Sequence, residues 1–351
     1  MKLYNCGNCN QPLYFENTKC LLCGHVTGFD PNQLLMITLI SKDQIEFSDI
    51  TNNQISYRFC QNAIHGTCNW LISLDTNASF CLACELNRTI PSLNNQKNLE
   101  RWNRIEVAKH RLVYSLIKLN LPIQRKKGDG ENELVFDFLE ALSPDKRVIT
   151  GHDSGTITIN IEEADEAERV RNKLDLGEKY RTLLGHFRHE IGHYYWEVMI
   201  QNNSCLGKFR ELFGNEEEDY ALSLKKYYSR GVFENWSEYF ISPYASSHPW
   251  EDWAESWSHY LHMMDTLETA YSFGIGIHPE KFKHTQELDI VVSRDPYTID
   301  DFDSIVKTWY PLTFAVNSLN RSMGHADFYP FVISPIVVKK LQFIHEVCRN
   351  K

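Results

Sequence analysis

Eight of the ten cysteines in this 351-residue chain lie before residue 85, in two groups of four. The first group is a pair of C-x-x-C motifs ten residues apart, a spacing that lets two tight turns supply four thiolates in tetrahedral array. The second group is C-x7-C followed by C-x-x-C, and one half of it is irregular. We expect two closed structural zinc sites, because about 90 residues with few large apolar runs need metal to fold. The ligands are Cys6, Cys9, Cys20 and Cys23, then Cys60, Cys68, Cys81 and Cys84.

Other features of the sequence favour metal over disulfides. Residues 1–9 contain no apolar run that could begin a secretion signal, and no stretch approaches ~18 uninterrupted apolar residues. We therefore predict a cytoplasmic protein with no membrane partner, in a reducing compartment where C-x-x-C pairs hold zinc. His65 is an alternative to Cys60 or Cys68 as a ligand. Cys205 and Cys348 are left over and are expected to be free thiols.

Charge is unevenly divided along the chain. Residues 1–127 carry 14 Lys+Arg against 9 Asp+Glu, and the remainder carries 22 against 37, which gives +5 and −15 of the total −10. Two zinc ions on eight thiolates would cancel most of the N-terminal excess. This balance does not favour a general nucleic-acid binder, which would need a clearer basic face. Docking of a protein or nucleic acid through the zinc-binding region stays an alternative to a purely structural role.

The pattern of residues predicts a two-part, α+β protein. Residues 1–92 are expected to form small β modules stapled by zinc, and residues 93–351 a mostly helical domain with a small sheet. Apolar periodicity predicts helices, and strict alternation predicts strands with one buried face. The expected elements are helices over 99–121, 162–173, 178–201 and 250–267, strands over 134–138 and 155–161, a turn over 125–131, a polar insert over 202–236 and a helical tail.

The sequence H-E-I-G-H in the middle of the helix expected over 178–201 predicts a catalytic zinc site. His189 and His193 are four residues apart, so both imidazoles project from one helix face and can bind one ion. Glu190 then lies beside the metal, where its carboxylate can reach a water held by the ion and act as general base. Apolar residues flank the motif, which argues against a chance pattern on a surface helix.

A catalytic zinc needs a third protein ligand and an open position for water. The block E-D-W-A-E-S-W places Glu251 and Glu255 four residues apart, shortly after Pro249. One carboxylate can ligate while the other orients a metal-bound histidine. A solvated acidic face at a helix start is the competing interpretation. His259 is the reserve ligand.

These two motifs together resemble those of the gluzincin metallopeptidases, in which two histidines and a downstream glutamate bind the metal. The resemblance implies that Glu251 is the third ligand and Glu255 supports a ligand. The motifs are also similar to the catalytic domain of anthrax lethal factor, where a tyrosine seven residues before the ligand glutamate faces the reacting carbonyl. Tyr244 occupies that position, which implies that it stabilises the oxyanion, and Tyr239 is a competitor. This likeness covers only the two metal-binding helices.

Over nearly its whole length the chain also resembles a bacterial family of zinc-binding metallopeptidases with an N-terminal zinc ribbon. The likeness is carried by four segments: residues 60–91, 155–163, 183–196 and 244–261. The resemblance implies a gluzincin-like domain preceded by zinc-ribbon modules.

The function that these features predict is zinc-dependent hydrolysis of peptide bonds in a peptide or protein substrate, with one catalytic and two structural zinc ions. A zinc-activated water attacks, Glu190 takes its proton and then protonates the leaving amine, and Tyr244 with zinc holds the oxyanion. Two alternatives stay open: a non-catalytic binding protein on a peptidase scaffold, and a protease of DNA-bound proteins.

Two further features allow competing interpretations. The strand over 155–161 is a candidate edge for pairing with an extended substrate, or else a central strand. His186, His248, His259 and His262 are expected to be partly buried histidines satisfied by neighbours.

Overall fold

The computed structural model describes residues 2–43, 45–125, 133–141, 148, 150–175, 182–280 and 286–349. Contacts divide the chain into two compact units, Met1–Arg169 and Val170–Lys351. The turn expected over 125–131 lies almost wholly outside the described residues. Within the described ranges, no helix is both long and apolar enough to cross a membrane.

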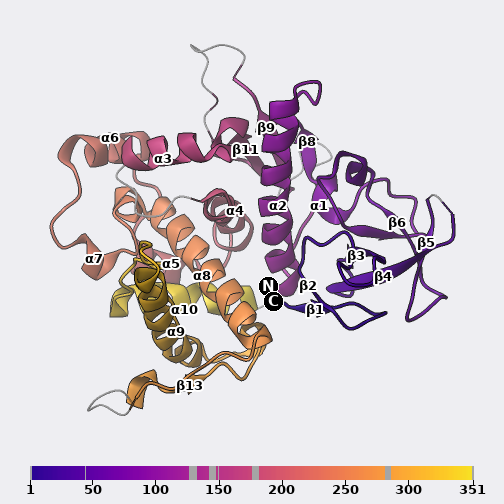
Figure 1. Cartoon of the computed structure of the whole chain (residues 1–351). Helices are drawn as coiled ribbons and strands as arrows, with labels where there is room; N and C mark the ends of the chain where they lie inside the picture. The colour runs from indigo at the N-terminus through magenta and orange to yellow at the C-terminus, as the bar shows by residue number, and fades with distance from the viewer. Residues whose placement is uncertain are drawn as a thin grey trace. The chain divides into compact units, whose positions relative to one another are not determined.

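The first unit begins with small antiparallel sheets (Figure 1). A short β1–β2 hairpin is followed by a five-stranded sheet in the order β3-β4-β5-β6-β7, with short helices in the second cysteine group. These elements confirm the expected small β modules. Their bounds are β1 Tyr4–Asn5, β2 Pro12–Leu13, β3 Val26–Asp30, β4 Leu35–Ser41, β5 Phe47–Asp49, β6 Ser56–Phe59, η1 Gln61–His65, β7 Leu71–Ser73 and α1 Leu82–Glu85.

Helix α2 (Gln96–Lys118) packs onto these modules. Asn95 caps it by accepting a hydrogen bond from the Lys97 amide at 3.0 Å. The expected apolar face is buried, and Tyr114 reaches the ring of Phe29, which in turn contacts Trp70 at a centroid distance of 5.0 Å. The first unit therefore extends well past residue 92, and a domain boundary at that residue stays a prediction.

A second sheet in the same unit has the order β10-β11-β9-β8. Strand β11 pairs in parallel with β9 and antiparallel with β10, so both of its edges are occupied. The expectation that this strand offers a free edge to a substrate is wrong, and the central-strand interpretation is confirmed. Alternation shows which face is buried but not which strands lie alongside. The bounds are β8 Asn87–Thr89, β9 Val135–Leu139, β10 Gly151–Asp153, β11 Thr156–Asn160, η2 Ile161–Ala164 and α3 Glu166–Asp175.

The second unit is mostly helical, and α4 (Leu183–Met199) and α8 (Pro249–Ser272) lie side by side at its centre (Figure 1). Thr182 caps α4 by accepting from the Gly185 amide at 3.0 Å. The expected helix began at 178, and residues 178–181 lie outside the described residues. The remaining elements are α5 Leu206–Phe213, α6 Tyr220–Arg230, α7 Trp236–Tyr239, η3 Tyr244–Ser247, β12 Gly276–Ile277, η4 Gln286–Leu288, β13 Ile290–Val291, η5 Pro296–Thr298, α9 Phe302–Ser322 and α10 Pro335–Arg349.

Gly192 explains how closely these two helices approach. A Cβ atom added there would meet the Ala254 Cα at 3.0 Å and the Trp257 Cβ at 3.1 Å. The indole Nε1–H of Trp253 donates to the Gly192 carbonyl at 2.8 Å. The small residue inside the H-E-I-G-H motif thus lets α8 bring its acidic side chains to the histidines. The polar insert expected over 202–236 in fact contains α5 and α6, and Phe209 and Phe213 of α5 are buried.

Candidate metal centre

The side chains of His189 and His193 meet on one face of α4, as their spacing predicts. Their Nε2 atoms lie 3.2 Å apart. The two residues are 9% and 4% exposed, so water screens them little. Two nearly buried imidazole nitrogens this close together are suited to share a cation.

Glu251 enters the same space from the first turn of α8. Its Oε2 lies 3.0 Å from His189 Nε2 and 3.5 Å from His193 Nε2, and the residue is only 2% exposed. With zinc bonds of about 2.0–2.1 Å to nitrogen and oxygen, neighbouring ligands of a tetrahedral ion lie roughly 3.3 Å apart. The three atoms therefore fit one zinc ion. Glu251 Oε2 is also buried without a hydrogen bond of good geometry among the described residues, as a metal ligand would be.

Glu255 lies behind the histidine pair, one turn further along α8. His189 Nδ1–H donates to Glu255 Oε1 at 2.8 Å, which leaves Nε2 directed at the candidate metal position. Burial opposes protonation of His189, yet its contacts with Glu251 and Glu255 raise its pKa well above the ordinary value. Burial by itself would raise the pKa of Glu251, but the facing histidines have the larger effect and hold that pKa well below the usual range. The contacts with the histidines thus favour the ionised form of both carboxylates.

Glu190 lies beside the three candidate ligands and does not belong to the metal-capable group found in the described residues. Its Oε1 is 3.2 Å from His186 Nε2, and the residue is 5% exposed. Burial raises the pKa of Glu190, but His186 and the nearby histidines lower it below the ordinary value on balance. The carboxylate is therefore ionised near neutral pH and able to accept a proton. His186 is a neighbour of this carboxylate and not a fourth member of the cluster.

Two tyrosines reach the cluster. The ring of Tyr244, at the start of η3, lies 6.1 Å from the ring of His189. Tyr220, the first residue of α6, donates its hydroxyl to Glu251 Oε1 at 2.6 Å. Burial raises the pKa of both phenols, so both are protonated donors at neutral pH. The sequence drew attention to Tyr244 but not to Tyr220, which lies 31 positions before its partner with no pattern to link them.

The other residues that the sequence offered for this site lie outside the metal-capable group in the described residues. His259, the reserve ligand, contacts the Tyr329 hydroxyl through Nδ1 at 2.7 Å and does not belong to the metal-capable group found in the described residues. His248 caps α8: its Nδ1 accepts from the Trp250 amide at 3.1 Å, and its Nε2–H donates to the Glu218 carbonyl. His262 Nδ1 accepts a hydrogen bond from the Arg188 guanidinium. Tyr239 is 46% exposed on α7. All three histidines are satisfied by neighbours, as expected.

The first cysteine group brings its four sulfurs together. Cys6 and Cys23 lie 3.6 Å apart, and Cys9 and Cys20 lie 3.5 Å apart. All four sulfurs are within 4.8 Å of one another. With zinc–sulfur bonds of about 2.3 Å, the thiolates of a tetrahedral site lie roughly 3.8 Å apart. The geometry suits a structural zinc.

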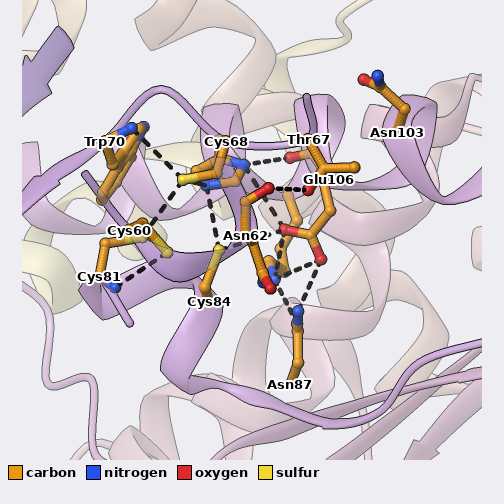
Figure 2. A network of polar contacts seen from close by, with 12 residues as sticks. Cys60, Asn62, Thr67, Cys68, Trp70, Cys81, Cys84, Asn87, Asn103 and Glu106 are labelled. Atoms are coloured by element: carbon orange, nitrogen blue, oxygen red, sulfur yellow. Dashed lines mark hydrogen bonds and ion pairs between the residues drawn. The ribbon is translucent and has the colours of Figure 1, made fainter. Parts of the chain in front are cut away.

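The second cysteine group is compact as well, despite its irregular spacing (Figure 2). Cys68 and Cys81 lie 3.7 Å apart, and all four cysteines of the group are buried. His65, the alternative ligand, packs against the Trp102 ring instead, at a centroid distance of 5.8 Å. Cys205 and Cys348 belong to no metal-capable group in the described part of the chain.

A histidine that the sequence analysis did not single out joins this second group. His110 of α2 places its Nε2 3.3 Å from Cys68 Sγ and 3.8 Å from Cys84 Sγ. Its Nδ1–H donates to the Glu106 carbonyl at 2.6 Å, which fixes the ring. The Glu106 carboxylate, in turn, is fully buried and pairs with Lys109 at 2.9 Å. Helix α2 is therefore tied directly to the second cysteine site.

Comparison with known proteins matches the two parts of the chain to two families. Residues 98–347 match the family described as "Putative zinc-binding metallo-peptidase", and residues 3–95 match a zinc-ribbon domain. The first match covers well over half of the chain. The chain belongs to this zinc-binding metallopeptidase family.

Relatives of this chain match it over nearly its entire length. Proteins from Mycobacterium tuberculosis and Mycobacterium bovis are 38% identical to it over 348 residues, which is 99% of this chain and 95% of theirs. Their names, "Uncharacterized protein", assign no activity. No solved structure matches the chain. Zinc binding is supported jointly by the two family matches and the cysteine clusters.

Proposed function

We propose that this protein is a zinc-dependent peptidase of the gluzincin type that hydrolyses peptide bonds in a peptide or protein substrate. The observation that carries the proposal is the convergence of His189, His193 and Glu251 at spacings that suit one tetrahedral ion with a position left for water. Two further zinc ions would be structural, one in each cysteine group. The peptidase domain would run over residues 93–351, after ribbon modules over residues 1–92.

Each side chain has a distinct part in the reaction. Zinc, when bound, supplies a Lewis acid that lowers the pKa of a water molecule to ~7. Glu190 accepts the proton from the attacking water, because it is ionised, nearly buried and next to the ligand pair. It then returns that proton to the leaving amine.

The remaining residues orient and stabilise. Glu255 holds His189 in the tautomer whose Nε2 faces the ion. Tyr244 keeps its hydroxyl proton at neutral pH and can donate a hydrogen bond to the oxyanion that forms as the peptide carbonyl is attacked. Together these groups supply a base, an oriented ligand and an oxyanion donor, which are the parts that peptide hydrolysis needs.

The test is cleavage of a fluorescein-labelled, unfolded protein by the zinc-loaded full chain and its Glu190→Gln variant. Glu190→Gln is expected to keep its zinc and lose at least 100-fold in kcat, since general-base catalysis contributes about 10²–10⁴-fold. Glu211→Gln, an exposed residue on α5, makes the same chemical change away from the site and should match wild type. Equal activity in Glu190→Gln and wild type would make the peptidase proposal untenable and favour the binding-protein alternative.

A further inference from the structure

The two oxygens of the Glu251 carboxylate have different neighbours. Oε2 faces the imidazoles of His189 and His193, whereas Oε1 accepts the hydrogen bond from the Tyr220 hydroxyl at 2.6 Å. A hydrogen bond to an ionised acceptor is stronger than one between neutral groups. The carboxylate is therefore held so that a single oxygen points to the candidate metal position.

The Tyr220 ring contacts two other aromatic rings. It packs edge-on against His248 at a centroid distance of 5.2 Å and against Trp250 at 6.0 Å. These two residues form the start of α8, immediately before Glu251. The hydroxyl is thus positioned relative to the same helix end that carries the carboxylate.

Tyr220 itself is 39% exposed, at the start of its helix. The helix that carries Tyr220, α6, buries none of its side chains. An otherwise lightly packed surface helix therefore places one specific hydroxyl on a candidate zinc ligand.

This arrangement matters for coordination. A carboxylate that binds through both oxygens would occupy two positions, and with two histidines it would fill a four-coordinate site. A carboxylate held by one oxygen leaves the fourth position to water. We propose that Tyr220 is a positioning residue of the metal centre, which holds Glu251 as a one-oxygen ligand and keeps a coordination position open. The inference rests on the proposed zinc site and deepens it.

The test is zinc affinity of the full chain, a readout that does not depend on activity. Tyr220→Phe keeps the ring and removes only the hydroxyl, and loss of such a supporting contact typically weakens metal binding 10–100-fold. We expect about a 10-fold weaker affinity at one of three sites in a titration against a chromophoric chelator. The site is identified as the one that His193→Ala lacks.

Control variants separate this role from a general effect on folding. Tyr228→Phe makes the same change at a 61% exposed position on α6 and should bind zinc as wild type does. Tyr244→Phe should bind zinc with nearly wild-type affinity and lower kcat. Cobalt substituted at this site should show weaker visible absorption in Tyr220→Phe, because a carboxylate free to bind through both oxygens raises the coordination number.

The outcomes are distinguishable from those of the proposed function. Wild-type zinc affinity and an unchanged cobalt spectrum in Tyr220→Phe would overturn the role of Tyr220, even if the chain cleaves protein. Weakened zinc binding in this variant, in a chain that cleaves no protein, would support the role of Tyr220 while the peptidase proposal fails.

Discussion

Replacing Gly192 by alanine tests whether close packing of α4 and α8 is what assembles the site. The added methyl group would sit 3.0 Å from the Ala254 Cα and 3.1 Å from the Trp257 Cβ, closer than ordinary contact. The first neighbour is backbone, which cannot rotate away. The helices must therefore move apart by a few tenths of an ångström, and Glu251 moves with α8.

The magnitude follows from two opposing effects. Overpacking a well-packed interior costs about 1–3 kcal/mol, whereas alanine gains up to ~1 kcal/mol over glycine in a helix interior. We expect Gly192→Ala to lower the free energy of unfolding by about 1–2 kcal/mol and to weaken zinc binding at the histidine site.

The assay is urea unfolding followed by tryptophan fluorescence, because four of the eight tryptophans lie on these two helices: Trp196, Trp250, Trp253 and Trp257. Gly207→Ala on α5 is the matched control, since an added methyl there meets nothing within 4 Å. It should be neutral or slightly stabilising. If Gly192→Ala is as stable as Gly207→Ala and binds zinc equally well, the close approach of the two helices is not what builds the site.

Two further predictions concern the first unit. Arg101, whose side chain is 9% exposed, donates to Asp165 Oδ2 at 2.6 Å and holds the pKa of that carboxyl below its ordinary value of 3.8. Asp165→Asn should therefore lower the free energy of unfolding by about 1–2 kcal/mol at pH 7. In urea unfolding, the difference in stability from wild type should shrink as the pH falls below 3.8 through the lowered pKa of Asp165. A difference that persists or grows in acid would contradict this reasoning. His110→Ala should weaken zinc binding at the second cysteine group about 10-fold in chelator competition. His110→Gln, whose amide can donate to the same sulfurs, should restore part of the zinc affinity. Wild-type affinity in His110→Ala would exclude a role for the imidazole.

Much of the architecture could be predicted from local patterns in the sequence, because apolar periodicity and the spacing of ligands are properties of a single helix. Apolar periodicity predicts α2 and α8 within a few residues of their observed bounds, and the spacing of four residues puts the imidazoles of His189 and His193 on one face. The same spacing brings Glu251 and Glu255 to one side of α8. Such patterns are visible in a single element and need no knowledge of its neighbours.

Contacts between distant elements could not be predicted in this way. Tyr220 and His110 each reach their partners from another helix, and a lone tyrosine or histidine has no periodicity to mark it. The neighbours of β11 are likewise a matter of tertiary pairing, since alternation in the strand is the same at an edge and in the centre of a sheet. Helices α5 and α6 lie in a segment whose polar composition hid them.

The measurement that most directly tests the central claim is the zinc content of the purified full chain beside that of His193→Ala and Glu251→Ala. We predict about three zinc ions per wild-type chain, two on cysteines and one on the pair of histidines with Glu251. Each variant should hold one fewer and keep its cysteine-bound zinc. Three zinc ions in both variants would show that these side chains bind no metal and would contradict the account.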